Sequence, residues 1–415
     1  MNALAEKLKS PLPTNDAEPR VYGRRWVILG VFVFIACMSQ VHWITFAPIT
    51  STAAAFYHTS DLMIGLLSMS FMVVYILVFL PAAWMIDTLG FRAAVGFGGI
   101  LMAVFGLTRG IFGSNFTAVF ISQIGLAVGQ PFIMGAITKI AVRWFPVRER
   151  ATASGLGTLA LYLGPLVAML LTPALVVRHG LPRTLVYYGV ATVVAAVLFI
   201  LVTREHPPTP AGRDERVLML DGLKTMVRRR DFLLLLAMFF VGLGVFNGVA
   251  TWIEDIVRPR GFTITQAGTL GGLMLVGGIV GAVIMPLLSD KLRRRKPFIV
   301  IALAGLIPGL LGMTYATHYG LLLLSGFAFG FFLLSAGPVG FQYGAEVTHP
   351  APEGTSNTLL IVIGQISGIV FIFAMDALKS KTTGAMTGSL VGLSVLTAVC
   401  VALAFTLRES PIRKT

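Results

Sequence analysis

Charged residues are scarce in this chain of 415 residues. Asp, Glu, Lys and Arg together make up 12% of it, whereas hydrophobic residues make up 56%. Because a soluble domain carries about 25% charged residues, this composition indicates a chain that lies in lipid. Cysteine is also rare: Cys37 and Cys400 are the two present, both inside apolar runs. That setting is typical of cysteines that act as small buried hydrophobes.

The sequence contains no cluster of metal ligands, no phosphate-binding glycine loop and no nucleophile with its partners. We therefore expect no enzyme activity, no cofactor and no metal site. The formal net charge of +14 would suit a nucleic-acid partner. The basic residues, however, lie in loops between apolar runs, where they set the orientation of a membrane protein. No nucleic-acid partner is expected.

Apolar runs of about 20 residues recur along the chain, and such a run crosses a bilayer as a helix. Six of them precede one long basic stretch and six follow it. The sequence therefore predicts an all-α membrane protein with twelve transmembrane helices in two pseudo-symmetric six-helix bundles. The predicted spans are 25–51, 62–86, 93–113, 117–143, 151–177, 182–203, 231–257, 266–289, 297–317, 320–345, 354–377 and 385–407.

The basic stretch 204–230 contains seven Lys and Arg residues and divides the chain into halves of similar length. Residues 217–226 within it are expected to form a short surface helix. The expected domains are an N-terminal tail (1–24), a first bundle (25–203), a basic linker (204–230), a second bundle (231–408) and a C-terminal tail (409–415).

Orientation follows from the Lys and Arg residues of the loops. If the N-terminus is cytoplasmic, 25 of the 32 Lys and Arg residues fall on the cytoplasmic side. This asymmetry predicts a multi-pass protein of the cell (inner) membrane with the linker and both termini in the cytoplasm.

Acidic residues recur at a nearly constant offset in the two halves. Asp87 and Asp290 are 203 residues apart, and Glu149 and Glu353 are 204 apart. The loop Asp87-Thr-Leu-Gly-Phe-Arg92 resembles the signature of the major facilitator superfamily, although Arg293 stands where the second copy would have Gly. In that superfamily the aspartate pairs with an arginine and the start of a neighbouring helix. The resemblance implies a cytoplasmic gate formed by Asp87, Arg92, Glu149, Arg150, Asp290 and Glu353; the alternative is a set of ordinary solvated loop charges.

Polar side chains inside the spans are functional hypotheses by default. Gln130, Asn247 and Gln365 each lie near mid-depth in their spans. Trp43 plus 204 is Asn247, so we expect these two residues to face each other between the halves, where transporters commonly bind their solute. His42 is either a hydrogen-bonded structural residue or a proton carrier.

Two acidic residues near the outer end of the seventh span, Glu254 and Asp255, form either a solvated rim or an electrostatic funnel for cations. No Lys or Arg is expected at mid-depth, because Lys139 lies near the inner end of its span and Arg109 near the outer end. Mid-depth Asp and Glu are absent as well. A desolvated anion normally needs a basic partner. The sequence therefore favours a cationic or neutral solute and weakens a proton-coupled mechanism.

Segments of both halves are similar to the feline leukaemia virus subgroup C receptor family. They include Gln40-Val-His-Trp43, 67–75, Gly129-Gln130 and Glu353-Gly-Thr-Ser with the later Gln365. Members of that family are linked to choline, ethanolamine and haem transport. In the family, a tryptophan of the first helix, a tyrosine of the seventh and glutamines of the fourth and eleventh surround a quaternary ammonium. The resemblance gives these roles to Trp43, Gln130 and Gln365, with Asn247 at the tyrosine position.

The sequence therefore predicts a secondary active or facilitative transporter that works by alternating access. Its expected substrate is a small choline-like organic cation or amine. We expect a monomer, with the lipid bilayer as its other partner. The expected cavity is lined by Trp43, Gln130, Asn247 and Gln365, with His42 and Tyr75 at its edge. One alternative is transport of another metabolite, such as an organic anion, a haem-like molecule or a lipophilic drug. The other is a non-transporting membrane sensor.

Overall fold

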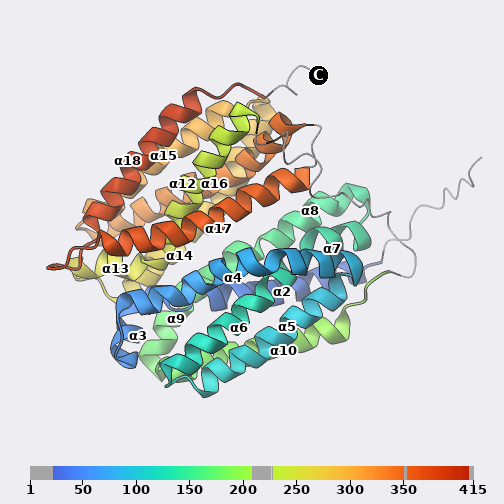
Figure 1. Ribbon diagram of the computed structural model, residues 1–415, viewed down its shortest axis with the longest axis horizontal. Helices are drawn as coiled ribbons and strands as arrows, with labels where there is room; N and C mark the ends of the chain where they lie inside the picture. The colour runs from blue at the N-terminus through green and yellow to red at the C-terminus, as the bar shows by residue number, and fades with distance from the viewer. Residues whose placement is uncertain (1–21, 208–225, 227, 350–352, 411–415) are drawn as a thin grey trace, which may run out of the picture.

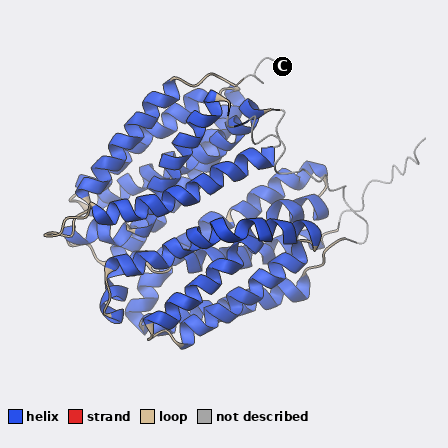
Figure 2. Ribbon diagram, in the orientation of Figure 1, coloured by secondary structure: helices blue, strands red, loops and turns tan. Residues whose placement is uncertain are grey.

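The computed structural model describes residues 22–207, 226, 228–349 and 353–410. Within these ranges twelve helices are long and apolar enough to cross a bilayer. The predicted all-α class, the number of spans and their division into two bundles are confirmed (Figure 1 and Figure 2). The short helix predicted for 217–226 and both tails lie almost wholly outside the described residues.

The first bundle contains six spans, three of which are interrupted. Its elements are α2 (Arg24–Ile44), η1 (Ala47–Ile49), α3 (Thr50–Tyr57), α4 (Asp61–Thr88), α5 (Phe91–Ile111), α6 (Phe116–Met134), α7 (Ile137–Trp144), α8 (Val147–Thr158), α9 (Ala160–His179) and α10 (Leu181–Val202). The second bundle consists of α12 (Arg230–Thr251), α13 (Ile253–Val257), η2 (Arg258–Arg260), α14 (Ile264–Leu292), α15 (Lys296–Tyr315), α16 (Tyr319–Thr348), α17 (Glu353–Ala377) and α18 (Thr387–Phe405).

Local chemistry fixes where several helices begin. The side chains of Ser60 and Asn115 accept hydrogen bonds from backbone N–H groups in the first turns of α4 and α6. Thr263 and Gln266 form a reciprocal capping box at the start of α14. Each cap satisfies a backbone donor that has no partner within the helix.

The first helix of each bundle breaks near the same depth. In the first bundle α2 ends at Ile44 and a 3-10 turn that contains Pro48 leads into α3. In the second bundle α12 ends at Thr251 and continues as the short helix α13. These breaks place polar segments at the end of the molecule opposite the starts of α2 and α12.

The two bundles lie side by side, with the first coloured blue to green and the second yellow to red in Figure 1. One end of the molecule, here called the terminal face, carries the starts of α2 and α12 and the end of α18. The other end, the distal face, carries α3 and α13. Large apolar side chains such as Leu77, Val177 and Leu201 are at least 70% exposed on the outside. Water would oppose such exposure, whereas lipid accepts it.

Candidate functional site

Ion pairs join the two bundles at the distal face. Asp61, at the start of α4, accepts a hydrogen bond of 2.7 Å from Arg258 and another of 2.7 Å from Lys379. Asp61 belongs to the first bundle, whereas both cations belong to the second. Because opposite charges on different bundles attract, this cluster holds the distal halves together.

Asp255 completes this cluster, which we call the distal clamp (Asp61, Asp255, Arg258 and Lys379). It accepts hydrogen bonds of 2.6 Å from Lys379 and 2.9 Å from Arg258, and it is fully buried. Burial raises the pKa of Asp255 to about 7, and the negative charge of Asp61 adds to this effect, while Lys379 and Arg258 oppose it. The clamp therefore contains a carboxyl group that titrates near neutral pH.

Glu254 makes a second contact between the bundles beside the clamp. Its carboxylate accepts hydrogen bonds from the backbone N–H of Ser51 at 2.9 Å and from the Ser51 hydroxyl at 2.8 Å. Glu254 is 2% exposed. The interpretation of Glu254 and Asp255 as a solvated rim is therefore wrong, because docking of the bundles removes both carboxylates from water.

Close backbone approach extends this contact inward from the distal face. The Trp252 ring lies against Gly65 of α4, where a Cβ atom would come within 2.8 Å of it. A Cβ atom on Gly268 would lie 2.2 Å from the carbonyl oxygen of Met169, so α14 packs directly on α9. Gly65 thus makes room for the Trp252 ring, and Gly268 lets α14 approach the backbone of α9 without a side chain between them.

The terminal face is held differently. The ion pairs described there each join residues of one bundle: Lys139 with Asp87 at 3.0 Å, Arg25 with Glu149 at 2.9 Å, Arg143 with Glu205, and Arg295 with Asp290 and Glu346. Charges thus bridge the bundles at the distal face, while these terminal pairs leave the bundles unlinked.

The six predicted gating residues are all placed at the terminal face by their positions in the helices. Asp87 lies against Lys139 of α7, whereas the Arg92 side chain donates to the Ile200 carbonyl at 3.3 Å. Arg150 donates to the Phe145 carbonyl at 3.2 Å. Asp290 does contact an arginine, Arg295. The side chain of Glu353 lies outside the described residues.

A repeated carboxylate at this face was missed in the sequence. Glu205 accepts hydrogen bonds from the backbone N–H groups of Phe91 and Arg92 at the start of α5. Glu409, 204 residues later, accepts from the backbone N–H groups of Arg295 and Lys296 at the start of α15. A negative charge at a helix N-terminus is stabilising. The 204-residue offset between these glutamates is the signal that could have found them.

Positive backbone φ angles occur at related positions in the two halves. Gly90 precedes α5 with φ of +92°, and Arg293, 203 residues later, follows α14 with φ of +48°. Glycine adopts this left-handed region without cost, but an arginine is strained there. The two positions share a positive φ, but ψ is +166° at Gly90 and +43° at Arg293, so the two turns differ in conformation.

An aromatic pair spans the bundles at the depth of the predicted cavity. Trp43 of α2 and Phe246 of α12 have ring centroids 6.4 Å apart, and Trp43 is 8% exposed. The neighbouring Asn247 lies against α17, where a Cβ atom on Gly368 would come within 2.8 Å of its amide nitrogen. The same Cβ atom would lie 2.6 Å from the sulfur of Met72 on α4. Trp43 and Asn247 therefore both lie at the bundle interface, with Phe246 as the direct contact of Trp43.

The two glutamines and Tyr75 are placed on other helices. Gln130 is on α6 and 8% exposed, and Gln365 is half-buried on α17, three residues before Gly368. Tyr75 on α4 stacks on Phe79 at 6.3 Å. Among the described residues, no hydrogen bond is formed by the side-chain amides of Gln130, Asn247 or Gln365, so these amides retain capacity for a ligand.

His42 occupies a different environment from Trp43. Its ring is fully buried inside the first bundle, with Nδ1 2.6 Å from the Arg109 guanidinium and Nε2 2.7 Å from the Thr192 hydroxyl. Arg109 also donates to Gln123 at 2.6 Å. Since a guanidinium is only a donor, Nδ1 accepts and Nε2–H donates to Thr192. His42 is thus a hydrogen-bonded structural residue here and does not line the bundle interface.

Arg109 changes one premise taken from the sequence. The residue is near the distal end of α5, as expected, but its side chain reaches the level of His42 and is fully buried. Its guanidinium is directed at His42, Gln123 and the Phe46 ring within the first bundle. The guanidinium of Arg109 therefore contacts His42, the residue next to Trp43 in the chain, but it is enclosed by protein within the first bundle.

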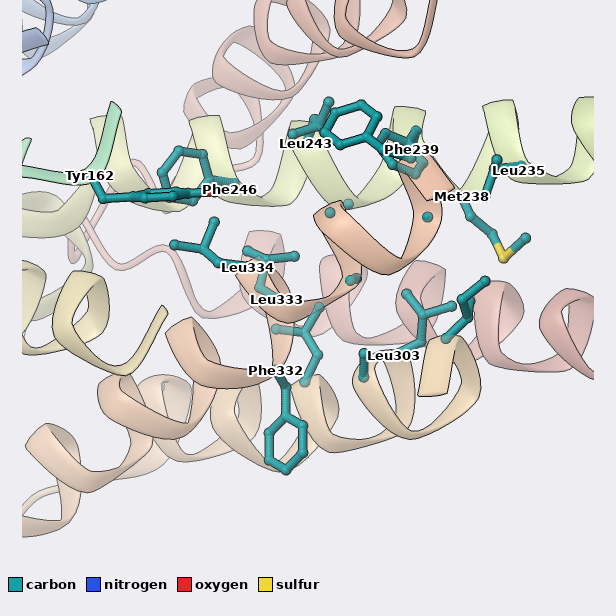
Figure 3. A pocket seen from close by; sticks show the side chains of 18 residues that line it. Tyr162, Leu235, Met238, Phe239, Leu243, Phe246, Leu303, Phe332, Leu333 and Leu334 are labelled. Carbon is teal, nitrogen blue, oxygen red and sulfur yellow. The ribbon is translucent and has the colours of Figure 1, made fainter. Parts of the chain in front are cut away.

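A cavity of about 120 Å³ lies beside the aromatic pair, between α12, α15 and α16. Figure 3 shows it extending from Tyr162 and Phe246 at one end to Leu235 and Met238 at the other. Tyr162 comes from α9, so both bundles contribute. The six residues predicted to bind the solute are not among those that line it; Phe246 and Tyr162 are the residues that sequence reasoning did not select.

Residues 28–372 match the family model described as Major Facilitator Superfamily. Solute carrier family 49 member A3 of Danio rerio is 31% identical over 394 residues, covering 90% of this chain and 82% of that protein. The choline/ethanolamine transporter FLVCR1 of Mus musculus is 27% identical over 417 residues, covering 92% of this chain and 74% of that protein.

Solved structures share the fold at low sequence identity. A bacterial homologue of the human lysosomal transporter Spinster, in an inward-facing and unoccupied conformation, has a TM-score of 0.74 at 16% identity, covering 93% of this chain and 97% of the other. A D-xylose-proton symporter has a TM-score of 0.74 at 14% identity, covering 94% and 98%.

Proposed function

This chain belongs to the Major Facilitator Superfamily, and from that premise we propose that it carries a small organic cation or amine across the membrane by alternating access. Its relatives and fold are those of transporters and not of enzymes, and it is a multi-pass membrane protein. The solute, the orientation and the site residues are the parts that we propose.

The proposed orientation puts the terminal face in the cytoplasm of a cell (inner) membrane. The support is the placement of 25 of the 32 Lys and Arg residues on that side, together with the basic linker 204–230. In this orientation the distal clamp closes the outer side. The 25–203 and 231–408 halves then move relative to each other within a single chain, and we propose that a monomer suffices.

The aromatic pair carries the substrate proposal. Trp43 and Phe246 meet across the bundle interface, and a cation within about 6 Å of such ring faces is attracted by their electrons. The side-chain amides of Gln130 on α6, Asn247 on α12 and Gln365 on α17 form no hydrogen bond among the described residues. Amide oxygens accept hydrogen bonds from an amine. Two relatives whose names state a substrate are choline/ethanolamine transporters.

The buried guanidinium of Arg109 also supports a solute that is not an anion. The Arg109 guanidinium is fully buried and already donates to His42 and Gln123. A desolvated carboxylate or phosphate needs a basic partner that faces it. We therefore expect lactate-like and phosphorylated solutes to bind poorly, and millimolar-or-better binding of such an anion, lost on changing a pocket residue, contradicts the proposal.

The experiment that tests the proposal is a ligand screen on the purified chain in lipid nanodiscs, followed by uptake into liposomes. A ligand that binds only the folded state raises its apparent stability. Choline, ethanolamine and tetramethylammonium should raise the melting temperature, and Trp43→Ala should reduce that shift. Equal shifts in Trp43→Ala, or uptake of anions alone, rule out the proposed cation site.

A further inference from the structure

The described residues that line the apolar cavity between α12, α15 and α16 include no charged side chain and no side-chain amide. Its lining consists of aliphatic and aromatic side chains together with glycine and alanine, and the Tyr162 hydroxyl is the only polar side-chain group that the described residues contribute to it. A polar or hydroxylated group placed there would lack hydrogen-bond partners, which is costly. The chemistry of the cavity selects a hydrocarbon.

The cavity begins where the proposed cation site ends. Phe246 lines it, and the same ring lies 6.4 Å from Trp43. From Phe246 the cavity extends along α12 past Phe239 to Leu235, toward the terminal face. Phe246 therefore borders both the proposed cation site and the cavity.

Small residues keep this space open. A Cβ atom on Gly337 of α16 would meet nothing within 4 Å, and one on Gly242 of α12 would meet only the Leu333 side chain, at 3.9 Å. Elsewhere in the bundle many glycines are needed for close helix contact, as at Gly277, where a Cβ atom would come 2.3 Å from the Phe327 carbonyl. Gly242 and Gly337 thus border empty space and do not serve close helix packing.

We propose that this cavity binds the alkyl chain of an amphiphilic organic cation, so that the protein prefers alkyl-substituted ammonium ions to choline itself. The inference rests on the proposed function, because it assumes an ammonium group at Trp43 and Phe246. The transfer of each methylene group from water into an apolar site makes the free energy of binding more favourable. Affinity for the ammonium ion therefore rises up to about fourfold per methylene until the cavity is filled.

The test uses the whole chain in lipid nanodiscs and a series of alkyltrimethylammonium ions from tetramethylammonium to hexyltrimethylammonium, with choline for comparison. Binding is measured by isothermal titration calorimetry. Gly242→Leu should fill the cavity and abolish the gain with chain length while leaving the affinity for tetramethylammonium within about twofold. Gly392→Leu on α18 is the matched control, because a Cβ atom there also meets nothing within 4 Å and lies outside the cavity.

A second variant, Ala336→Leu, fills the same cavity from α16 if Gly242→Leu does not fold. An equal rise with chain length in wild type, Gly242→Leu and Gly392→Leu indicates partition into lipid and overturns the inference. Equal affinity for all ammonium ions, lowered by Trp43→Ala, also overturns it but retains the cation site. If no ammonium ion of any length binds, the proposed function itself fails.

Discussion

Arg258 of the second bundle donates a hydrogen bond of 2.7 Å to Asp61 of the first, 197 residues away in the chain. Lys379 donates to the same carboxylate at 2.7 Å. Transport by alternating access requires the distal halves to separate in each cycle. These contacts must therefore break and re-form, and their strength sets how often the distal face opens.

Removal of one cation from the distal clamp should favour opening of that face. Lys379→Ala leaves Asp61 of the first bundle with Arg258 alone, and the loss of a charged hydrogen bond between the bundles costs about 1.5–3 kcal/mol. We expect longer distances between spin labels placed on α3 and η2. Lys381→Ala, which removes an exposed lysine two residues away, is the control. Unchanged distances in Lys379→Ala contradict a clamping role.

The clamp should also respond to pH. The pKa of Asp255 is about 7 in the closed state because of its burial, whereas a solvated aspartate has a pKa of about 3.9. The closed state thus binds the proton more tightly, so acidification from pH 8 to 6 should favour it about tenfold. The spin-label distances measured over this range report the shift. Asp255→Asn, which mimics the protonated carboxyl, should be closed at both pH values; an increase in opening on acidification contradicts the assignment.

Asp87→Asn should impair transport without loss of stability. In this structure Asp87 is paired with Lys139, but the Asp87 side chain is 68% exposed. The pair therefore contributes at most about 1 kcal/mol to the free energy of unfolding. The proposed role of Asp87 lies in the opposite state, where the terminal face is closed. Uptake into liposomes should fall while the melting temperature stays within a degree or two. Undiminished uptake removes Asp87 from the gate.

Changes at the aromatic pair should alter cation affinity in a graded way. Trp43→Ala should weaken binding roughly 2- to 30-fold, since a cation–π contact is worth about 0.5–2 kcal/mol. Trp43→Phe should lose less, because a weaker π face remains. Asn247→Tyr should improve choline binding if this chain and its choline-transporting relatives share a cavity. Isothermal titration calorimetry measures the affinity of all three variants. An unchanged choline affinity in Asn247→Tyr, with folding intact, argues against a shared cavity.

The repeated carboxylate caps should contribute to stability in both halves. Glu205→Gln and Glu409→Gln each weaken the hydrogen bonds that two backbone N–H groups donate at the starts of α5 and α15. We expect a loss of about 0.5–2 kcal/mol for each, the range of N-terminal capping effects. Denaturant unfolding in detergent measures it. Asp87→Asn is a useful comparison, because the Asp87 carboxylate pairs with the Lys139 side chain and caps no helix start among the described residues. An effect confined to one half would argue against equivalence of the caps.

The sequence alone determined the spans and their duplication. Hydropathy is a local property, because each helix in lipid must satisfy its own backbone hydrogen bonds whatever its neighbours are. The twelve spans and the offset that relates Asp87 to Asp290 therefore follow from the order of residues. The offset between Glu205 and Glu409 is likewise a property of that order, although the role of these carboxylates as helix caps is not.

Only the tertiary structure decided which polar groups meet. Lys379 and Asp61 are 318 residues apart, and nothing in their local sequence selects one as the partner of the other. Docking of the bundles at the distal face buries Asp255 and Glu254, for which the sequence left open a solvated rim or an electrostatic funnel. Helix rotation directs His42 toward Arg109 and Trp43 toward Phe246, although the two residues are adjacent. The cavity beside Phe246 likewise arises from three helices and one side chain of α9, whose relative positions depend on packing between spans and not on the composition of any one of them.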